Sequence, residues 1–162
     1  MQGKVKLISA ELIREVADQA AVNPRCRQNY NFHDSPDDIC QRLLNAMEPG
    51  SYIQPHRHAI NPKPEMFLAV AGRLGLILFS DRGEITATHE LAPSGRLLGV
   101  EIPSGLWHTV ISLEKGSVFL EVKPGPYIPL SGQDFAAWAP AGGEPAATAY
   151  LETLHAAFGR AG

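Results

Sequence analysis

Three histidines and one glutamate are the residues of this chain best suited to chemistry. His56 and His58 are separated by one residue, so on an extended strand both side chains project from the same face. Two neutral imidazoles directed at one point can present nitrogen ligands to a metal. Glu65 begins one expected strand, and His108 begins another directly after a tight turn containing proline and glycine. We therefore predict a metal site formed by His56, His58, Glu65 and His108.

The ligand set indicates one divalent transition metal in an open site. A single histidine such as His108 is more often an ordinary core or surface residue, so the prediction depends on the combination. Three imidazoles and one carboxylate leave room for water or substrate, as a catalytic metal requires. Zinc is the first expectation, iron is the alternative for a redox role, and nickel, manganese and copper also suit these ligands. Neither cysteine lies in the motifs, which argues against a closed structural zinc site.

The spacing of these residues resembles that of the cupin superfamily. Gly50…His56-x-His58…Glu65…Gly72 is similar to the first cupin motif, and Pro103-x-Gly105-x-x-His108 is similar to the core of the second. The chain departs from the usual pattern in three places: six residues separate His58 from Glu65 instead of three or four, and Leu97 and Ser112 replace a glycine and an asparagine of the second motif. Prolines at 62 and 64 cannot continue a strand, so we expect a bulged turn to absorb the extra residues and Glu65 to remain a ligand.

The sequence around the motifs resembles that of one subgroup, the WbuC-type cupin-fold metalloproteins found with O-antigen (surface-polysaccharide) gene clusters. The matching stretches are 42–50, 99–103, 107–109 and 121–127, within a resemblance that covers about residues 25–138. The resemblance implies a cupin fold and a connection to polysaccharide biosynthesis. It implies no reaction, because one fold hosts many chemistries.

Short apolar runs separated by turns predict the framework that positions the ligands. Many short strands without intervening helices indicate a mainly β fold, a double-stranded β-helix or jelly-roll barrel. The expected strands are 40–47, 51–54, 66–70, 74–80, 84–90, 97–102, 108–113 and 118–123.

The flanking segments are expected to be helices and loops of the same single domain. An edge strand is expected at 5–9, followed by a helix that Ser9 caps and Pro24 closes. A polar loop should follow at 25–38, and after the barrel core (39–123) we expect a C-terminal extension (124–162) with one turn at 134–138 and a helix between Pro145 and Gly159.

Three charged residues on otherwise apolar strands are the candidate catalytic groups. Arg42, Glu101 and Glu121 could face solvent, as most charged residues do. If they face the barrel, they would line a polar substrate pocket, together with Asn45. His33 lies in the polar loop and is expected to be a loop or lid residue rather than a fifth ligand.

Composition and charge exclude several other classes. The chain has 162 residues, of which 44% are hydrophobic, so it is not a disordered tail, and 14 basic against 17 acidic residues leave no excess charge for nucleic acid. The longest uncharged apolar run, 74–80, is too short to cross a membrane, and the N-terminus does not resemble a signal peptide.

Two cysteines make no disulfide framework, so we expect a cytoplasmic protein. A homodimer is the default expectation, with 5–9 as an edge for the partner.

The predicted metal site leaves two classes of function open, and in both the protein binds a small molecule. The first is a metal-dependent enzyme (an isomerase, hydrolase or oxygenase) acting on a small polar molecule such as a sugar or sugar nucleotide. The second is a non-catalytic, metal-dependent binding module for a carbohydrate or effector. Titratable groups beside the metal would favour the enzyme, and a neutral or apolar pocket would favour the binder. A metal-free sugar epimerase fits less well, because it would crowd three histidines without a cation.

Overall fold

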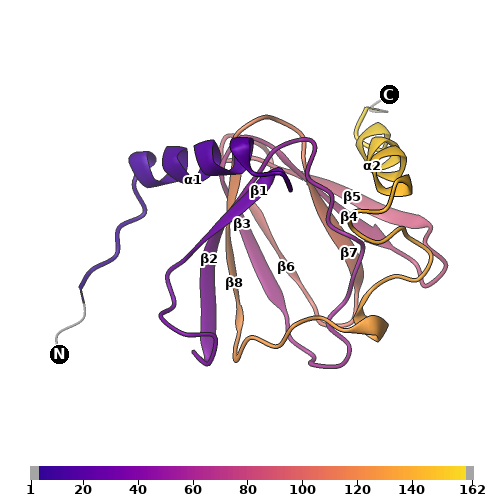
Figure 1. The fold of residues 1–162 in the computed structure, drawn as a ribbon, viewed down its shortest axis with the longest axis horizontal. Coiled ribbons are helices and arrows are strands. Elements are labelled where there is room, and N and C mark those ends of the chain that lie inside the picture. The colour runs from indigo at the N-terminus through magenta and orange to yellow at the C-terminus, as the bar shows by residue number, and fades with distance from the viewer. Residues whose placement is uncertain (1–3, 160–162) are drawn as a thin grey trace.

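A computed structural model describes residues 4–159, which form a mainly β fold with one helix near each end (Figure 1). The predicted fold class is confirmed. The elements in chain order are α1 (Ala10–Val22), β1 (Arg27–Asn31), β2 (Cys40–Met47), β3 (Glu65–Ala71), β4 (Leu74–Phe79), β5 (Ile85–Leu91), β6 (Gly99–Ile102), β7 (Trp107–Ser112), β8 (Ser117–Pro124), the 3-10 turn η1 (Gly132–Asp134) and α2 (Ala146–Ala156).

The strands form two antiparallel sheets that face each other as a jelly roll. The larger sheet has the order β1-β2-β8-β3-β6, and the smaller has the order β5-β4-β7. Apolar side chains of both sheets meet between them, with Met47 and Phe67 from the larger sheet packing near Leu76 and Val110 from the smaller. This core occupies one part of the interior and leaves the rest for polar residues.

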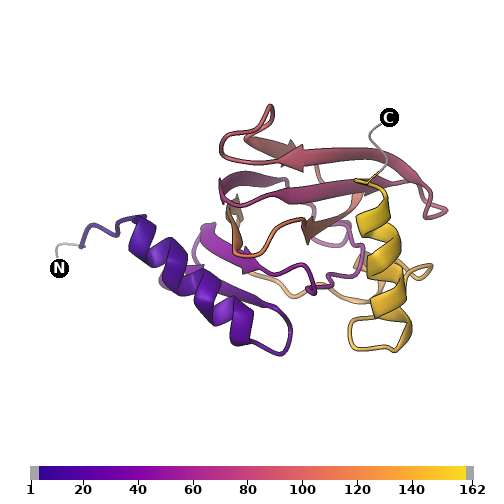
Figure 2. The ribbon, with the colours of Figure 1, turned by 90° about the horizontal axis from the view of Figure 1, so that it is seen from above.

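The two helices cover outer faces of different sheets (Figure 2). Val16 and Ala20 of α1 pack against Leu44 and Ala46 of β2, whereas α2 packs against β4 and β7. The N-terminus of α1 is capped as predicted, because the Ser9 hydroxyl accepts a hydrogen bond from the Leu12 N–H. The larger sheet is therefore buried on both faces over part of its area, which weakens the polar-apolar alternation in its sequence.

Three predicted elements differ from the structure. Residues 5–9 form no strand, so the proposed edge for a dimer partner is absent. Residues 51–54 belong to no strand. The polar segment 25–38, expected to be a loop, contains β1, which pairs with β2 from Arg27↔Met47 to Asn31↔Leu43. Its composition does not indicate a strand; the pairing with β2 makes it one. Within residues 4–159, no helix combines the length and the apolar character needed to span a bilayer.

Candidate metal centre

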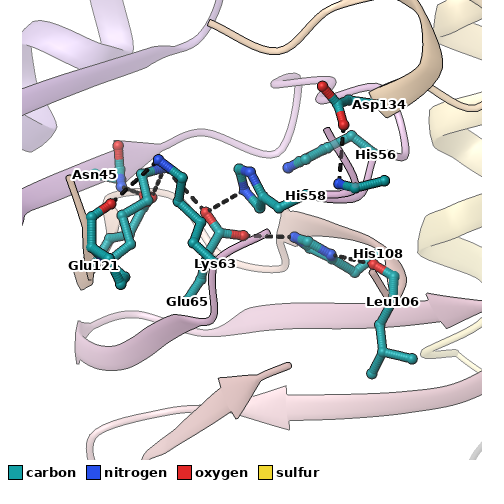
Figure 3. A network of polar contacts seen from close by, with 12 residues as sticks. Asn45, His56, His58, Lys63, Glu65, Leu106, His108, Glu121 and Asp134 are labelled. Atoms are coloured by element: carbon teal, nitrogen blue, oxygen red, sulfur yellow. Dashed lines mark hydrogen bonds and ion pairs between the residues drawn. The ribbon is translucent and has the colours of Figure 1, made fainter. Parts of the chain in front are cut away.

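His56 and His108 are direct backbone partners, although no regular strand contains His56. The N–H of each residue donates to the carbonyl oxygen of the other at 2.9 Å. Opposed residues in an antiparallel pair share a face, so both imidazoles enter the interior, with ring centroids 4.6 Å apart (Figure 3). Trp107, one residue earlier, projects to the opposite face and packs near α2, as the alternation predicts.

Backbone carbonyls set the tautomers of these two histidines. The Nδ1 atom of His56 lies 3.0 Å from the Gln54 carbonyl oxygen, and Nδ1 of His108 lies 3.0 Å from that of Leu106. Because a carbonyl oxygen only accepts, each Nδ1 carries the hydrogen and each Nε2 keeps its lone pair. Such a hydrogen bond on the second ring nitrogen is typical of metal-binding histidines.

Glu65 completes a convergent set of donor atoms. It begins β3, facing inward with Phe67, and its two carboxylate oxygens lie 3.0 Å from Nε2 of His58 and 3.0 Å from Nε2 of His108. Yet Nε2 of His58, Nε2 of His108 and Oε2 of Glu65 are buried without an aligned hydrogen bond. One ligand atom each of His56, His58 and Glu65 lies within 4.8 Å of the others. Buried nitrogen and carboxylate atoms that converge without an aligned hydrogen bond can share a cation, so these residues suit a divalent metal.

Electrostatics keep the cluster in the protonation states that a metal requires. Burial, followed by repulsion from His108, lowers the pKa of His56 to about 3, so its ring is neutral. Burial alone would raise the pKa of Glu65, but contacts with His108, His58 and Lys123 hold it well below its ordinary value. A neutral imidazole and an ionised carboxylate are the metal-binding forms of these groups.

The long loop between His58 and Glu65 is held by two buried charged residues. Oδ1 of Asp134 accepts hydrogen bonds from the N–H groups of Ala59 and Ile60, both at 3.1 Å. Nζ of Lys63 donates to the carbonyl oxygens of Pro124 and Pro126, at 3.3 and 3.2 Å. The extra residues therefore lie outside the register of β3, as predicted, and long-range contacts hold them in place.

A second charged group lies beside the cluster in the same interior. Glu121 is 7% exposed, pairs with Lys123 and accepts a hydrogen bond from the Asn45 side chain. Nζ of Lys123 also lies 3.1 Å from Oε1 of Glu65, so this lysine links the two carboxylates. Burial raises the pKa of Glu121. Burial alone would lower the pKa of Lys123, but the neighbouring carboxylates of Glu121 and Glu65 raise it above its ordinary value.

A cavity of about 260 Å³ opens onto these groups, which is enough room for a small molecule. His56, Glu65, His108, Glu121 and Lys123 contribute polar atoms to its wall, and the lining also includes Ile53, Phe67, Val110 and Phe119. The structure thus brings together the four predicted ligands and Glu121. Their roles as ligands and as a catalytic group stay predictions.

Two predicted catalytic residues do not reach the cavity. Glu101 is exposed and pairs in register with Met66, which is also exposed, so both face away from the interior. Arg42 lies on the same face of β2 as the residues under α1, and it pairs with Asp38 at 3.7 Å. Their assignment to the pocket is wrong. Side chains alternate between the two faces of a strand, and Arg42 and Glu101 each occupy the face that points away from the interior.

Sequence reasoning missed three residues that shape the site. Lys123 could have been found, because it lies two positions after Glu121 on a predicted strand and therefore shares its face. Asp134 and Arg27 act through contacts distant in sequence, for which no local signal exists. His33 lies outside the metal cluster, with Nδ1 3.0 Å from the carbonyl oxygen of Arg42, in agreement with its expected role in a loop.

Comparison with known families matches residues 8–91, just over half of the chain, to the family described as a domain of unknown function (DUF6016). The chain belongs to this family. The matched region contains His56, His58 and Glu65, but it ends before His108 and Glu121. No curated protein sequence is similar to the chain.

Several solved structures are similar in fold to this chain. The capsular polysaccharide assembling protein CapF of Staphylococcus aureus is 23% identical over 70% of this chain and 30% of its own length, with a TM-score of 0.54. The SPY1581 protein of Streptococcus pyogenes is 15% identical over 78% of this chain and 93% of that one, with a TM-score of 0.54. A cupin-2 domain protein of Shewanella frigidimarina is 17% identical over 60% and 80% of the two chains, with a TM-score of 0.46. This chain thus spans under a third of CapF, and such distant similarity shows the fold alone.

Proposed function

We propose that this protein is a metal-dependent cupin enzyme that acts on a small polar molecule such as a sugar or sugar nucleotide. The observation that carries the proposal is the convergence of three buried atoms without an aligned hydrogen bond, Nε2 of His58, Nε2 of His108 and Oε2 of Glu65. His56, His58, Glu65 and His108 would hold the ion, and zinc is the first candidate. A divalent cation bound there supplies Lewis-acid chemistry, which polarises a carbonyl or phosphoryl oxygen or a bound water.

The neighbouring residues favour an enzyme over a simple binding module. Glu121 places a carboxylate on the cavity wall, where it can exchange a proton with a bound molecule. Lys123 pairs with Glu121 and Glu65 and so holds both carboxylates in place. A purely structural cavity needs no such buried charged group, because burying charges costs free energy.

The finer parts of the proposal rest on the sequence resemblance. The similarity to WbuC-type proteins in 42–50 and 121–127 supports a place in surface-polysaccharide metabolism. The alternative is a non-catalytic module that binds a carbohydrate or effector through the metal.

The test begins with the metal content of the purified protein and titration of the metal-free protein with zinc and iron(II). The loaded protein is then incubated with nucleotide sugars, and products are followed by mass spectrometry. We expect one ion per chain and turnover that Glu121→Gln reduces at unchanged metal content. The matched control is Glu101→Gln, which removes the same charge from the outer face. Binding without turnover would favour the alternative, and the absence of metal binding would refute both.

A further inference from the structure

The unexpected strand β1 has polar side chains on the inward parity, of which Arg27 is half-buried and Asn29 and Asn31 are exposed to solvent. Arg27 and Asn29 lie opposite Met47 and Asn45 of β2, and Asn31 lies opposite Leu43. Met47 belongs to the core between the sheets, and Asn45 reaches Glu121 in the cavity, so this parity is the inward one.

The other face of the same segment is aromatic. Tyr30 and Phe32 stack edge to face with ring centroids 5.2 Å apart, and Phe32 packs with the cluster beneath α1. A strand that only completed a core would place these rings inward. Here the polar residues point inward, which is the pattern expected of a wall that contacts a polar ligand.

Arg27 is held in place, but no acid neutralises it. Its Nη1 donates to the Tyr52 carbonyl oxygen at 2.8 Å and lies 3.4 Å from the Ser51 hydroxyl. Among the described residues, the arginines that form ion pairs are Arg14, Arg42, Arg57 and Arg73. Arg25 and Arg27 form none, and both line the cavity that holds the metal ligands.

The charge of the cavity wall is therefore positive. Three basic residues, Arg25, Arg27 and Lys123, line the cavity with two carboxylates, those of Glu65 and Glu121. A bound divalent metal would add two more positive charges. A half-buried guanidinium without an acidic partner is well suited to a carboxylate or phosphate, which it binds with two parallel hydrogen bonds.

A second hollow of about 310 Å³ lies beside the first. Asn29 and Lys123 line both, so the two spaces adjoin. The second is lined by Asn31, His33 and Tyr127, which offer amide, imidazole and phenol groups, and Tyr127 is 53% exposed. Neutral donors and acceptors beside an accessible aromatic ring match the hydroxyl groups and apolar ring face of a carbohydrate.

We propose that the site takes an anionic carbohydrate, with its acidic group on Arg27 beside the metal site and its hydroxyl groups along Asn29 and Asn31 toward Tyr127. The inference rests on the proposed function, of which it names the substrate class. Between Arg27 and Asn31 the strand rises about 13 Å, so the ligand has roughly the length of a disaccharide or a nucleotide sugar.

The test measures binding by isothermal titration calorimetry with three probes of this length: lactose, which is neutral; lactobionate, which carries a carboxylate; and UDP-glucose, which carries phosphates. With metal-loaded protein we expect at least one of the two anions to bind about ten times more tightly than lactose. The tighter anion identifies the acidic group as carboxylate or phosphate. Equal affinity for lactose and both anions, or no binding of any probe, would overturn the inference.

Variants locate the binding on β1. Arg27→Gln should weaken the preferred anion about 10- to 100-fold and leave lactose unchanged, whereas Arg27→Lys should retain part of the preference. Asn31→Ala should weaken lactose and the anion alike, by about five-fold. The matched control is Arg14→Gln, which removes the same charge from the exposed surface of α1. Unchanged anion affinity in a folded Arg27→Gln variant would refute the role of Arg27.

Metal titration of the same proteins separates this inference from the proposed function. Arg27→Gln should bind metal like the unmodified protein, because the hydrogen bonds of Arg27 go to Ser51 and Tyr52 and not to a predicted ligand. If the protein binds no metal but still prefers the anion through Arg27, the metal-dependent function fails and the anion site stands. If metal binds and produces turnover without any anion preference, only the inference fails.

Discussion

Replacing Asp134 with alanine should loosen the metal centre without touching a predicted ligand. The carboxylate is 4% exposed and accepts hydrogen bonds from Ala59 and Ile60 at 3.1 Å and from Ser131 at 3.2 Å. Ala59 directly follows His58, so these bonds fix the backbone that carries one imidazole. Asp134 is therefore a positioning residue.

The magnitude follows from the three hydrogen bonds. Each bond to an ionised acceptor contributes about 1.5 to 3 kcal/mol, but Ala59 and Ile60 are exposed, so water replaces part of what they lose. Asp134→Ala should lower the free energy of unfolding by about 2 to 3 kcal/mol and metal affinity by about 10- to 100-fold. Asp134→Asn keeps the oxygen that accepts from Ala59 and Ile60 and should cost about 1 kcal/mol.

Acid provides an independent check of the same contacts. Burial would raise the pKa of Asp134, but the three backbone N–H groups hold it below the ordinary value of 3.8. Its stabilisation is therefore complete above about pH 4 and is lost as the pH falls through the lower pKa of the folded state. The unmodified protein and Asp134→Asn should then converge in stability.

Urea unfolding at several pH values and zinc titration of each variant are the assays. Asp134→Ala with unchanged metal affinity would refute the argument that this carboxylate positions His58. Equal losses for alanine and asparagine would show that the charge matters and the number of accepted bonds does not.

Three further predictions concern the metal and the turns. A chelator should leave the far-UV circular dichroism nearly unchanged, because the apolar core between the sheets forms without the ion; global unfolding would instead make the metal structural. Glu65→Gln should weaken zinc binding and His56→Ala should nearly abolish it, because glutamine keeps an oxygen but loses the charge; equal affinities in a zinc titration would contradict this ligand set. Gly72→Ala should lower the free energy of unfolding, measured in urea, by about 2 to 4 kcal/mol, because φ is +65° and a Cβ would lie 2.5 Å from the Ser117 hydroxyl. Gly116→Ala is the control: φ is +69° but the space around it is open, so the loss should be only about 1 to 2 kcal/mol.

Local patterns in the sequence predicted most strands, and they singled out four candidate metal ligands whose side chains the structure brings together. The strand at 40–47 has the predicted bounds, and β3 to β8 begin and end within a few residues of the prediction, whereas the expected strands at 5–9 and 51–54 do not form. Hydrophobic alternation, proline and glycine turns and the cap at Ser9 act over a few residues, so they can be read along the chain. The two-residue spacing of His56 and His58 is equally local.

Only the tertiary structure decided which face of each strand is inward. Alternation along a strand leaves open which of its two faces is inward. Because α1 buries the outer face of β2, Leu43 and Leu44, which follow Arg42, are equally apolar on the two faces and do not reveal the inward one. The same uncertainty concerned Glu101, which the register with Met66 resolves.

The polar segment 25–38 shows the limit of sequence reasoning most clearly. Arg27, Asn29 and Asn31 favour a loop by composition, yet hydrogen bonds to β2 make them an edge strand with its polar side inward. Strand formation there depends on a partner more than ten residues away. Contacts at such separation leave no periodic signal in the chain, and they decided both the cavity wall and the support of the metal ligands by Asp134.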